Sequence, residues 1–216
     1  MRVFVYGITG GVGRLLSRKL IDRGDRVTGL VRRESQRAEF EADGIETVIG
    51  ELSELTPEAL ASMLNGVDAI VFTAGSNAVN REVTTEIDGK GLAKTVEAAQ
   101  LAGVDRFVSV SVLPEALRGS GLTDDLEYYF AVKKIADVAL SASPLNWVIL
   151  RPSRLTDNRG VGVVALSPAQ LHGEISRDDV ATTVVELLHE GRIRRRVLEL
   201  DEGSTPILEA VHKNVG

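Results

Sequence analysis

Tyr129 and Lys133 lie four positions apart in the stretch YYFAVKK, which has a helical pattern. Residues with this spacing share one face of a helix. An ammonium group beside a phenol stabilises the phenolate, so we expect Lys133 to lower the pKa of Tyr129 from its ordinary value of about 10. Such a tyrosine could give a proton to a carbonyl oxygen, or take one from it, as hydride is transferred. The alternative is structural: Tyr129 packs its ring on a sheet and Lys133 is a solvated helix lysine.

A glycine-rich loop, YGITGGVG at residues 6–13, follows a short apolar run and precedes a helical pattern, which is the context of phosphate-binding loops. Gly7 permits a sharp turn, Gly10 permits the close approach of a pyrophosphate, and Gly13 permits close packing of the helix on the strand. The helix would point its free N–H groups and positive dipole end at the phosphates. The predicted cofactor-binding residues of this loop are Gly7, Thr9, Gly10, Gly11, Val12 and Gly13. The alternative is a bare turn between a strand and a helix.

Two arginines follow the second apolar run, in GLVRRESQR. Dinucleotide folds that prefer NAD place an acidic residue at this point, where it binds the ribose hydroxyls. Here Arg32 and Arg33 stand in its place, and guanidinium groups pair well with phosphate. We therefore predict binding of NADP in preference to NAD, the alternative being two solvated arginines at the start of a loop.

These residues are spaced along a chain in which short runs rich in Val and Ile alternate with helical patterns. The predicted strands are residues 2–6, 26–31, 46–50, 69–73, 106–112, 147–151 and 196–200, and the predicted helices are residues 11–23, 57–65, 86–102, 126–142 and 178–190. This alternation predicts right-handed crossovers and a parallel sheet with helices on both faces. We expect an α/β protein: a single Rossmann domain over residues 1–216 with a doubly wound sheet of about seven strands. Residues 152–195 are expected to form a small C-terminal region on the substrate side.

The least regular segments are residues 113–125 and 152–175, and each follows a predicted strand. Both should lie at the carboxyl edge of the sheet, where ligands bind in doubly wound folds. The glycines of RGSGL (118–122) suggest mobility, and whether 113–125 forms a mobile lid stays open at this point. Three further features have purely structural interpretations. SRDDVA (176–181) marks a helix start, the acids Asp124, Asp125 and Glu127 suit a helix N-terminus, and RIRRR (192–196) is a solvated connection.

The composition of the 216-residue chain excludes several classes of protein. It has no Cys and three scattered His, so disulfides, Cys nucleophiles and a metal site are not expected. Its net charge of −6, without a basic block, argues against a nucleic-acid partner. No signal peptide or membrane-spanning run is evident, so we expect a soluble, cytoplasmic protein with a small-molecule substrate and no membrane partner.

Taken in order, GITGGVG, LVRR, FTAG, VDRFVSVS, YFAVK, WVILRPSRLTD and ISRDDVA resemble the atypical short-chain dehydrogenase/reductase family. The likeness extends to about residue 190 and is closest to NADP-binding, NmrA-like and biliverdin-reductase-B-like members, a group that includes NAD-dependent epimerase/dehydratase types. The resemblance implies that Thr73, Ala74 and Gly75 line the adenosine side, and that Glu51 and Leu52 flank adenine. It also implies that Pro152 and Ser153 lie near the nicotinamide, and that Lys133 holds the nicotinamide ribose.

The same resemblance implies a catalytic set. Strand alternation puts Ser109 and Ser111 on one face, and Ser111 is nearer the carboxyl end, where this serine binds the substrate carbonyl in similar enzymes. The usual fourth member is Asn, but this chain has Asp88, which accepts and does not donate when ionised. The usual lysine-bound water relay is therefore in doubt. Each residue also has a structural alternative: a satisfied core serine, or an acid facing solvent near a helix start.

Three functions are consistent with these residues. The first is an NADP(H)-dependent oxidoreductase acting on a small carbonyl, quinone or flavin-like compound. The second is a non-catalytic sensor that binds NADP and regulates a partner. The third is an epimerase or dehydratase, which usually needs a larger C-terminal substrate domain than the roughly 60 residues after the sixth predicted strand. The helices 86–102 and 126–142 can form a dimer face in related enzymes, so a monomer and a homodimer both stay open.

Overall fold

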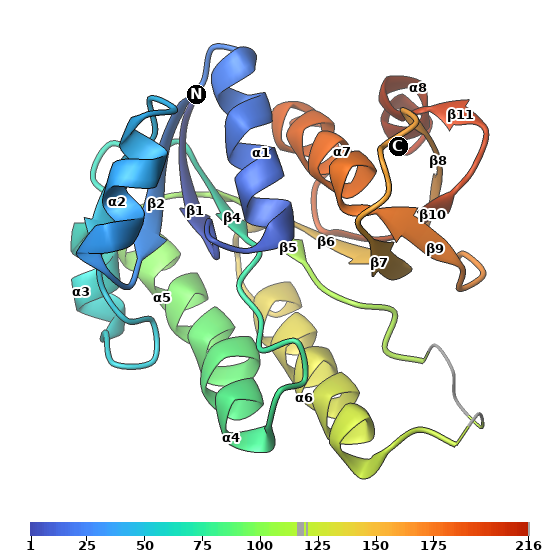
Figure 1. Cartoon of the computed structure of the whole chain (residues 1–216), viewed down its shortest axis with the longest axis horizontal. Coiled ribbons are helices and arrows are strands. Elements are labelled where there is room, and N and C mark those ends of the chain that lie inside the picture. Colours follow the sequence, from blue (N-terminus) through green and yellow to red (C-terminus); the bar gives the residue numbers. More distant parts are fainter. Residues whose placement is uncertain (116–118, 120, 216) are drawn as a thin grey trace.

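In the computed structural model, which describes residues 1–115, 119 and 121–215, the described residues build one nine-stranded sheet with the order β11-β8-β10-β6-β5-β4-β1-β2-β3 (Figure 1). In chain order its strands are β1 (Arg2–Tyr6), β2 (Arg26–Val31), β3 (Glu46–Ile49), β4 (Ala69–Phe72), β5 (Arg106–Val110), β6 (Asn146–Pro152), β8 (Val163–Ser167), β10 (Arg196–Glu202) and the short β11 at the edge. From β3 to β10 across the sheet, all neighbouring strands are parallel. The predicted α/β class and doubly wound parallel sheet are confirmed, because the order reverses at β1 and β4.

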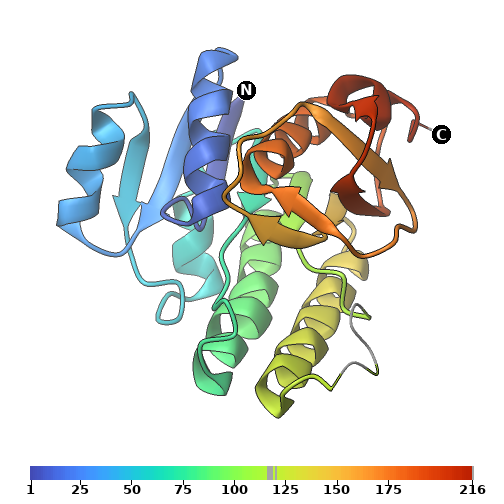
Figure 2. The same ribbon diagram turned by 45° about the vertical axis from the view of Figure 1, so that its right-hand side comes forward.

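The sheet is larger than predicted at one edge. There β8 runs antiparallel to β10 and to β11 (Thr205–Pro206), while β7 (Arg154–Thr156) and β9 (Glu174–Ser176) form a separate parallel pair. The expectation that 152–175 is irregular is therefore wrong. Three of these strands have only two or three residues, and β8, with five, is defined by its antiparallel partners β10 and β11. Figure 1 shows β7 and β9 below α7, and the turned view of Figure 2 shows them next to α1.

Helices cover both faces of the sheet. The first face carries α1 (Gly11–Asp22), α2 (Glu34–Glu41), α7 (Arg177–His189) and α8 (Ile207–His212), and the second carries α3 (Pro57–Ser62), α5 (Leu92–Ala102) and α6 (Asp124–Ser141). Along β1, Val3 and Val5 pack toward the first face, and Phe4 and Tyr6 pack toward the second. Burial on both faces is why the strands are continuous apolar runs.

The helix predicted at 86–102 begins earlier than expected. Asn80 caps it, its side chain accepting from the Val83 N–H (2.8 Å), and the helix continues as α4 (Arg81–Val83), the π-helical segment η1 (Thr84–Gly91) and α5. The π-helical segments of proteins occur often at functional sites. The segment η1 carries Asp88, one of the predicted catalytic residues.

The helix predicted at 126–142 is α6, which begins two residues earlier because Thr123 caps the Leu126 N–H. Asp124, Asp125 and Glu127 occupy its first turn, as predicted. The segment 113–125, for which the question of a lid was open, includes residues 116–118 and 120, which lie outside the described residues. Leu101 on α5 and Ile135 and Val138 on α6 are exposed, and the oligomeric state stays a prediction.

No helix within the described ranges combines the length and the apolar character needed to cross a membrane.

Candidate active site

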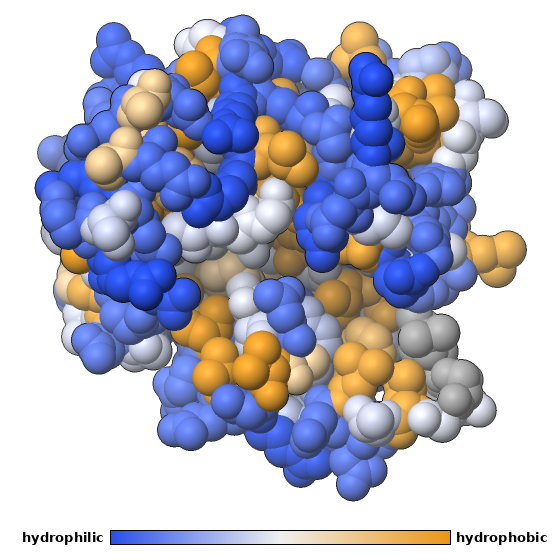
Figure 3. All heavy atoms as spheres, in the orientation of Figure 1, coloured by the Kyte–Doolittle hydropathy of each residue, from blue (hydrophilic) through white to orange (hydrophobic). Residues whose placement is uncertain are grey.

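A cavity of about 520 Å³ opens at the carboxyl ends of β1, β4 and β5. Its volume lies within the roughly 300–1,000 Å³ of ordinary ligand sites. Figure 3 shows this face of the molecule hollowed between the half that carries α1 and the half that carries α4 and α6. The predicted residues that line it are Gly7, Thr9, Gly10, Gly11, Val12, Arg32, Glu51, Leu52, Thr73, Ala74, Gly75, Ser111, Tyr129 and Lys133. Residues far apart in the sequence thus meet at the edge where the strand order reverses.

The glycine loop has the geometry that its spacing predicts. Gly7 adopts φ +84°, and a Cβ there would lie 2.4 Å from the Ala74 nitrogen. At Gly13, which does not line the cavity, a Cβ would lie 2.2 Å from the Gly7 carbonyl oxygen, so the glycine lets α1 pack on the loop. Gly10 precedes the helix without a side-chain cap. The first N–H groups of α1 are therefore left for an anion at the positive end of the helix dipole.

Arg32 and Glu51 mark one end of the cavity. The Arg32 Nε lies 4.0 Å from the Glu51 Oε2, and the Arg32 side chain is 63% exposed. Arg33 does not line the cavity, because it is the residue that precedes α2. The Gln36 side chain accepts from the N–H groups of both arginines (3.0 and 3.1 Å), which holds the turn between β2 and α2. Of the two predicted phosphate ligands, only Arg32 is thus at the cavity.

Asp88 lies behind the cavity wall and joins two parts of it. Its Oδ2 accepts from the Ser76 N–H (2.9 Å), and its Oδ1 lies 3.5 Å from the Lys133 Nζ. The carboxylate and the ammonium are almost completely buried, with 0% and 5% of the side chains exposed. Ser76 Oγ also shares a hydrogen bond with Thr84 Oγ1 (2.8 Å). Asp88 therefore holds Lys133 and the turn after β4 together without touching the cavity; its exposure to solvent, the structural alternative, is excluded.

Ser111 and Tyr129 both line the cavity. The Ser111 Oγ is buried and has no hydrogen-bond partner among the described residues, which leaves it available to a ligand. The expectation that Lys133 lowers the pKa of Tyr129 is wrong. Burial raises the pKa of Tyr129 above its ordinary value, and the Asp88 carboxylate raises it further. The ion pair with Asp88 offsets the charge of Lys133, and the phenol stays protonated at neutral pH.

The site differs from the predicted one in two further respects. Pro152 and Ser153 do not line the cavity: Pro152 ends β6, and Ser153 Oγ accepts from the Gly173 N–H (3.2 Å). Lining residues that sequence reasoning missed are Tyr6, Leu30, Gly50, Ser76, Asn77, Val79, Val83, Ile87, Val110, Val112, Leu155 and Arg177. Most are ordinary apolar residues without a motif. Arg177 belongs to SRDDVA, where the sequence indicated only the helix start.

Comparisons with known proteins agree with this geometry. A family model described as NAD(P)H-binding matches residues 7–191. An uncharacterized sugar epimerase of Bacillus subtilis, YhfK, is 40% identical over 99% of this chain and 100% of its own length. A Bacillus halodurans structure named after the NAD-dependent epimerase/dehydratase class has a TM-score of 0.89 and 31% identity, covering 99% of each chain. The structure of the oxidoreductase ylbE from Lactococcus lactis has a TM-score of 0.89 and 27% identity, covering 99% of this chain and 96% of that one.

Proposed function

This chain belongs to the NAD(P)H-binding family, and from that premise we propose that it is an NADP(H)-dependent oxidoreductase of the atypical short-chain dehydrogenase/reductase type. Its substrate would be a small carbonyl, quinone or flavin-like compound. The observation that carries the proposal is the single cavity that joins the glycine loop to Ser111, Tyr129 and Lys133. A site for binding alone would not need a buried hydroxyl, a phenol and an ammonium at the end away from Arg32.

The residues present fit a nicotinamide dinucleotide. The uncapped N-terminus of α1 suits its pyrophosphate, and the Thr73–Gly75 stretch together with Leu52 suits the adenosine. Lys133, held in place by Asp88, is positioned to donate to ribose hydroxyls. When bound, the nicotinamide supplies or accepts hydride, and the chain contributes orientation and proton transfer.

The protonation state of Tyr129 favours reduction. Its raised pKa keeps the phenol protonated at neutral pH, so it can donate a proton to a carbonyl or quinone oxygen. Ser111 Oγ, which lacks a partner among the described residues, can donate a second hydrogen bond to the same oxygen. The reverse reaction would need a phenolate and would therefore require alkaline conditions.

The preference for NADP is supported by Arg32. It lines the adenosine end, is largely exposed, and has Glu51 4.0 Å away as its ion-pair partner. A 2′-phosphate would give the guanidinium a second, doubly charged partner.

The substrate end is apolar. Val79, Val83 and Ile87 line it from the side of η1, and Leu155 lines it from the region 152–195. The cations that line the cavity within the described residues are Arg32, Lys133 and Arg177. The first two are assigned to the dinucleotide, which favours an uncharged substrate over a nucleotide sugar. The apolar substrate end therefore argues against the second candidate, an epimerase, which is suggested by the name of the Bacillus subtilis relative.

The test is NADPH oxidation against quinones, flavins and small aldehydes. Replacing Tyr129 by Phe should lower the rate roughly 100- to 10,000-fold without changing NADPH affinity. Tyr128→Phe is the matched control, because the Tyr128 hydroxyl bonds Thr85 Oγ1 (2.8 Å) and lies outside the cavity lining. If no acceptor supports turnover, the hypothesis of an oxidoreductase is refuted, and the non-catalytic NADP sensor becomes the better account of the site.

Cofactor preference has its own pair of variants. Arg32→Gln should weaken NADPH binding far more than NADH binding, and Arg33→Gln should change neither, since only Arg32 lines the cavity. Equal effects of Arg32→Gln on both cofactors would contradict a 2′-phosphate contact.

A further inference from the structure

Arg177 is the first residue of α7, and its side chain lies across the glycine loop. A Cβ on Gly11 would lie 2.7 Å from the Arg177 Cδ and 3.1 Å from its Nε. Gly11 is the first residue of α1. The absence of a side chain at Gly11 thus lets the arginine pass over the first turn of α1, where the free N–H groups of the loop are.

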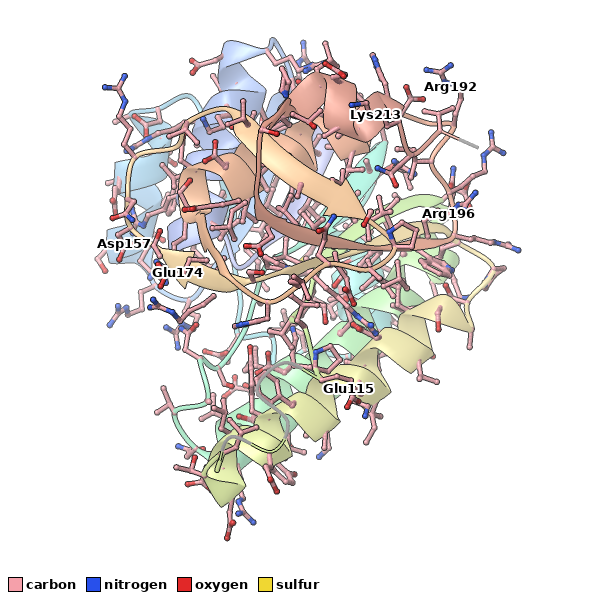
Figure 4. All side chains as sticks on the ribbon, turned by 90° about the vertical axis from the view of Figure 1, so that its right-hand side faces the viewer. Glu115, Asp157, Glu174, Arg192, Arg196 and Lys213 are labelled. Carbon is pink, nitrogen blue, oxygen red and sulfur yellow. The ribbon has the colours of Figure 1, made fainter. Side chains whose placement is uncertain are left out.

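The guanidinium is held by one acid and keeps donors for a ligand. Its Nη1 donates to the Asp157 Oδ1 (2.7 Å), while no hydrogen bond of Nε or Nη2 occurs within the described part of the chain. The Arg177 side chain is 28% exposed and that of Asp157 is 90% exposed. Figure 4 shows Asp157 near Glu174, at the small sheet of β7 and β9, on the opposite side of the view from Arg192 and Arg196. Asp157 therefore orients Arg177 from the outer side of the site.

The neighbouring acids are occupied elsewhere. Asp178 pairs with Lys19 (2.8 Å), and Asp179 accepts from the N–H groups of Val161 (3.0 Å) and Gly162 (2.8 Å). A cation at the N-terminus of its own helix is unfavourable, because the helix dipole is positive there. The position of Arg177 is thus unfavourable for α7. Its guanidinium, however, adds positive potential beside the N-terminus of α1, where the free N–H groups and the helix dipole already favour an anion.

We propose that Arg177 is a ligand of the diphosphate group of the dinucleotide, binding it from the side opposite to the amides of the glycine loop. This assignment rests on the proposed function, since it presumes a dinucleotide in the cavity. Arg32 and Arg177 then divide the recognition of phosphate: Arg32 binds the 2′-phosphate that distinguishes NADP, and Arg177 binds the diphosphate that NAD and NADP share.

Direct binding measurements on the full chain test this assignment. Isothermal titration with NADPH, NADH, ADP-ribose and adenosine 2′-phosphate compares the wild type with Arg177→Gln. Loss of charge-assisted hydrogen bonds to phosphate should lower the affinity for the three diphosphate ligands by a common factor of roughly 10 to 100. The affinity for adenosine 2′-phosphate should stay unchanged. The control is Arg154→Gln, which removes an exposed arginine paired with Glu174 on the same small sheet and should bind all four ligands normally.

A second variant keeps the test independent of folding defects in the first. Gly11→Ala places a methyl group against the aliphatic part of the Arg177 side chain. It should weaken the binding of ADP-ribose in the wild-type background, and should cause little further loss of affinity in the Arg177→Gln background. An equal loss in both backgrounds would mean that the methyl group meets the ligand, and would overturn the assignment. So would unchanged ADP-ribose affinity in Arg177→Gln, or a loss confined to NADPH. These results leave the proposed function standing, whereas a wild-type chain that binds no dinucleotide ends both proposals.

Discussion

The buried pair of Asp88 and Lys133 leads to a sharp prediction about stability. Replacing Asp88 by Asn keeps an oxygen that can accept from the Ser76 N–H, so the change chiefly removes the charge opposite Lys133. Two unit charges 3.5 Å apart attract by about 5 kcal/mol at an effective dielectric constant of 20. Removing one partner of a buried pair costs about 3–5 kcal/mol, because the other charge stays buried without compensation.

At about 2–4 °C per kcal/mol for a chain of this size, Asp88→Asn should lower Tm by roughly 6–20 °C. The assay is thermal unfolding at pH 7 without cofactor. Adding Lys133→Met should recover much of the loss, because the double variant no longer buries an unpaired charge. Glu86→Gln is the control on the same helix; it breaks the exposed pair with Lys90 (2.6 Å) and should leave Tm almost unchanged.

A fall of less than about 3 °C in Asp88→Asn would refute this reasoning, since it would correspond to only about 1 kcal/mol. A double variant no more stable than Asp88→Asn would refute it equally, because the loss would then come from the Ser76 turn and not from the charge of Lys133.

Three further predictions follow from the same structure. The rate of NADPH-dependent reduction should stay flat from about pH 6 to 9, because the raised pKa keeps Tyr129 protonated beyond its ordinary value of about 10; a pH–rate profile that falls with a midpoint below about pH 9 would contradict this. Gly13→Ala should lower Tm by roughly 2–12 °C, because its Cβ would meet the Gly7 oxygen, whereas Gly191→Ala, with nothing within 4 Å, should not. Burial raises the pKa of Asp25, but hydrogen bonds from the N-terminal ammonium and His189 outweigh it, so the folded pKa is lowered. The stabilisation that the ionised Asp25 gives the fold is complete above the unfolded pKa of about 3.9 and is lost as pH falls through the folded pKa. Asp25→Asn should therefore lower Tm at pH 7, and the difference in Tm between the variant and the wild type should be smaller at pH 3.

Local patterns were sufficient for the main features of this protein. The spacing of Gly7, Gly10 and Gly13 between a strand and a helix predicted the loop, because Gly7 needs a positive φ at the turn and Gly13 lets α1 pack on the Gly7 carbonyl. The buried parallel strands were recognisable because both of their faces are apolar. Helical spacing also placed Tyr129 and Lys133 on the same helix, and both line the cavity.

The tertiary structure decided what depends on contacts between distant segments. The pKa of Tyr129 rises because folding buries the phenol and brings Asp88, 41 positions earlier, into its surroundings. Only the packing of α7 against α1 brings Arg177 over Gly11. The strands β7 and β9, of three residues each, are too short to be recognised from local pattern, and β7, β8 and β9 are defined by their partners. Sequence periodicity reports which face of an element is buried, whereas burial of a charge and the partner that meets it are properties of the folded chain.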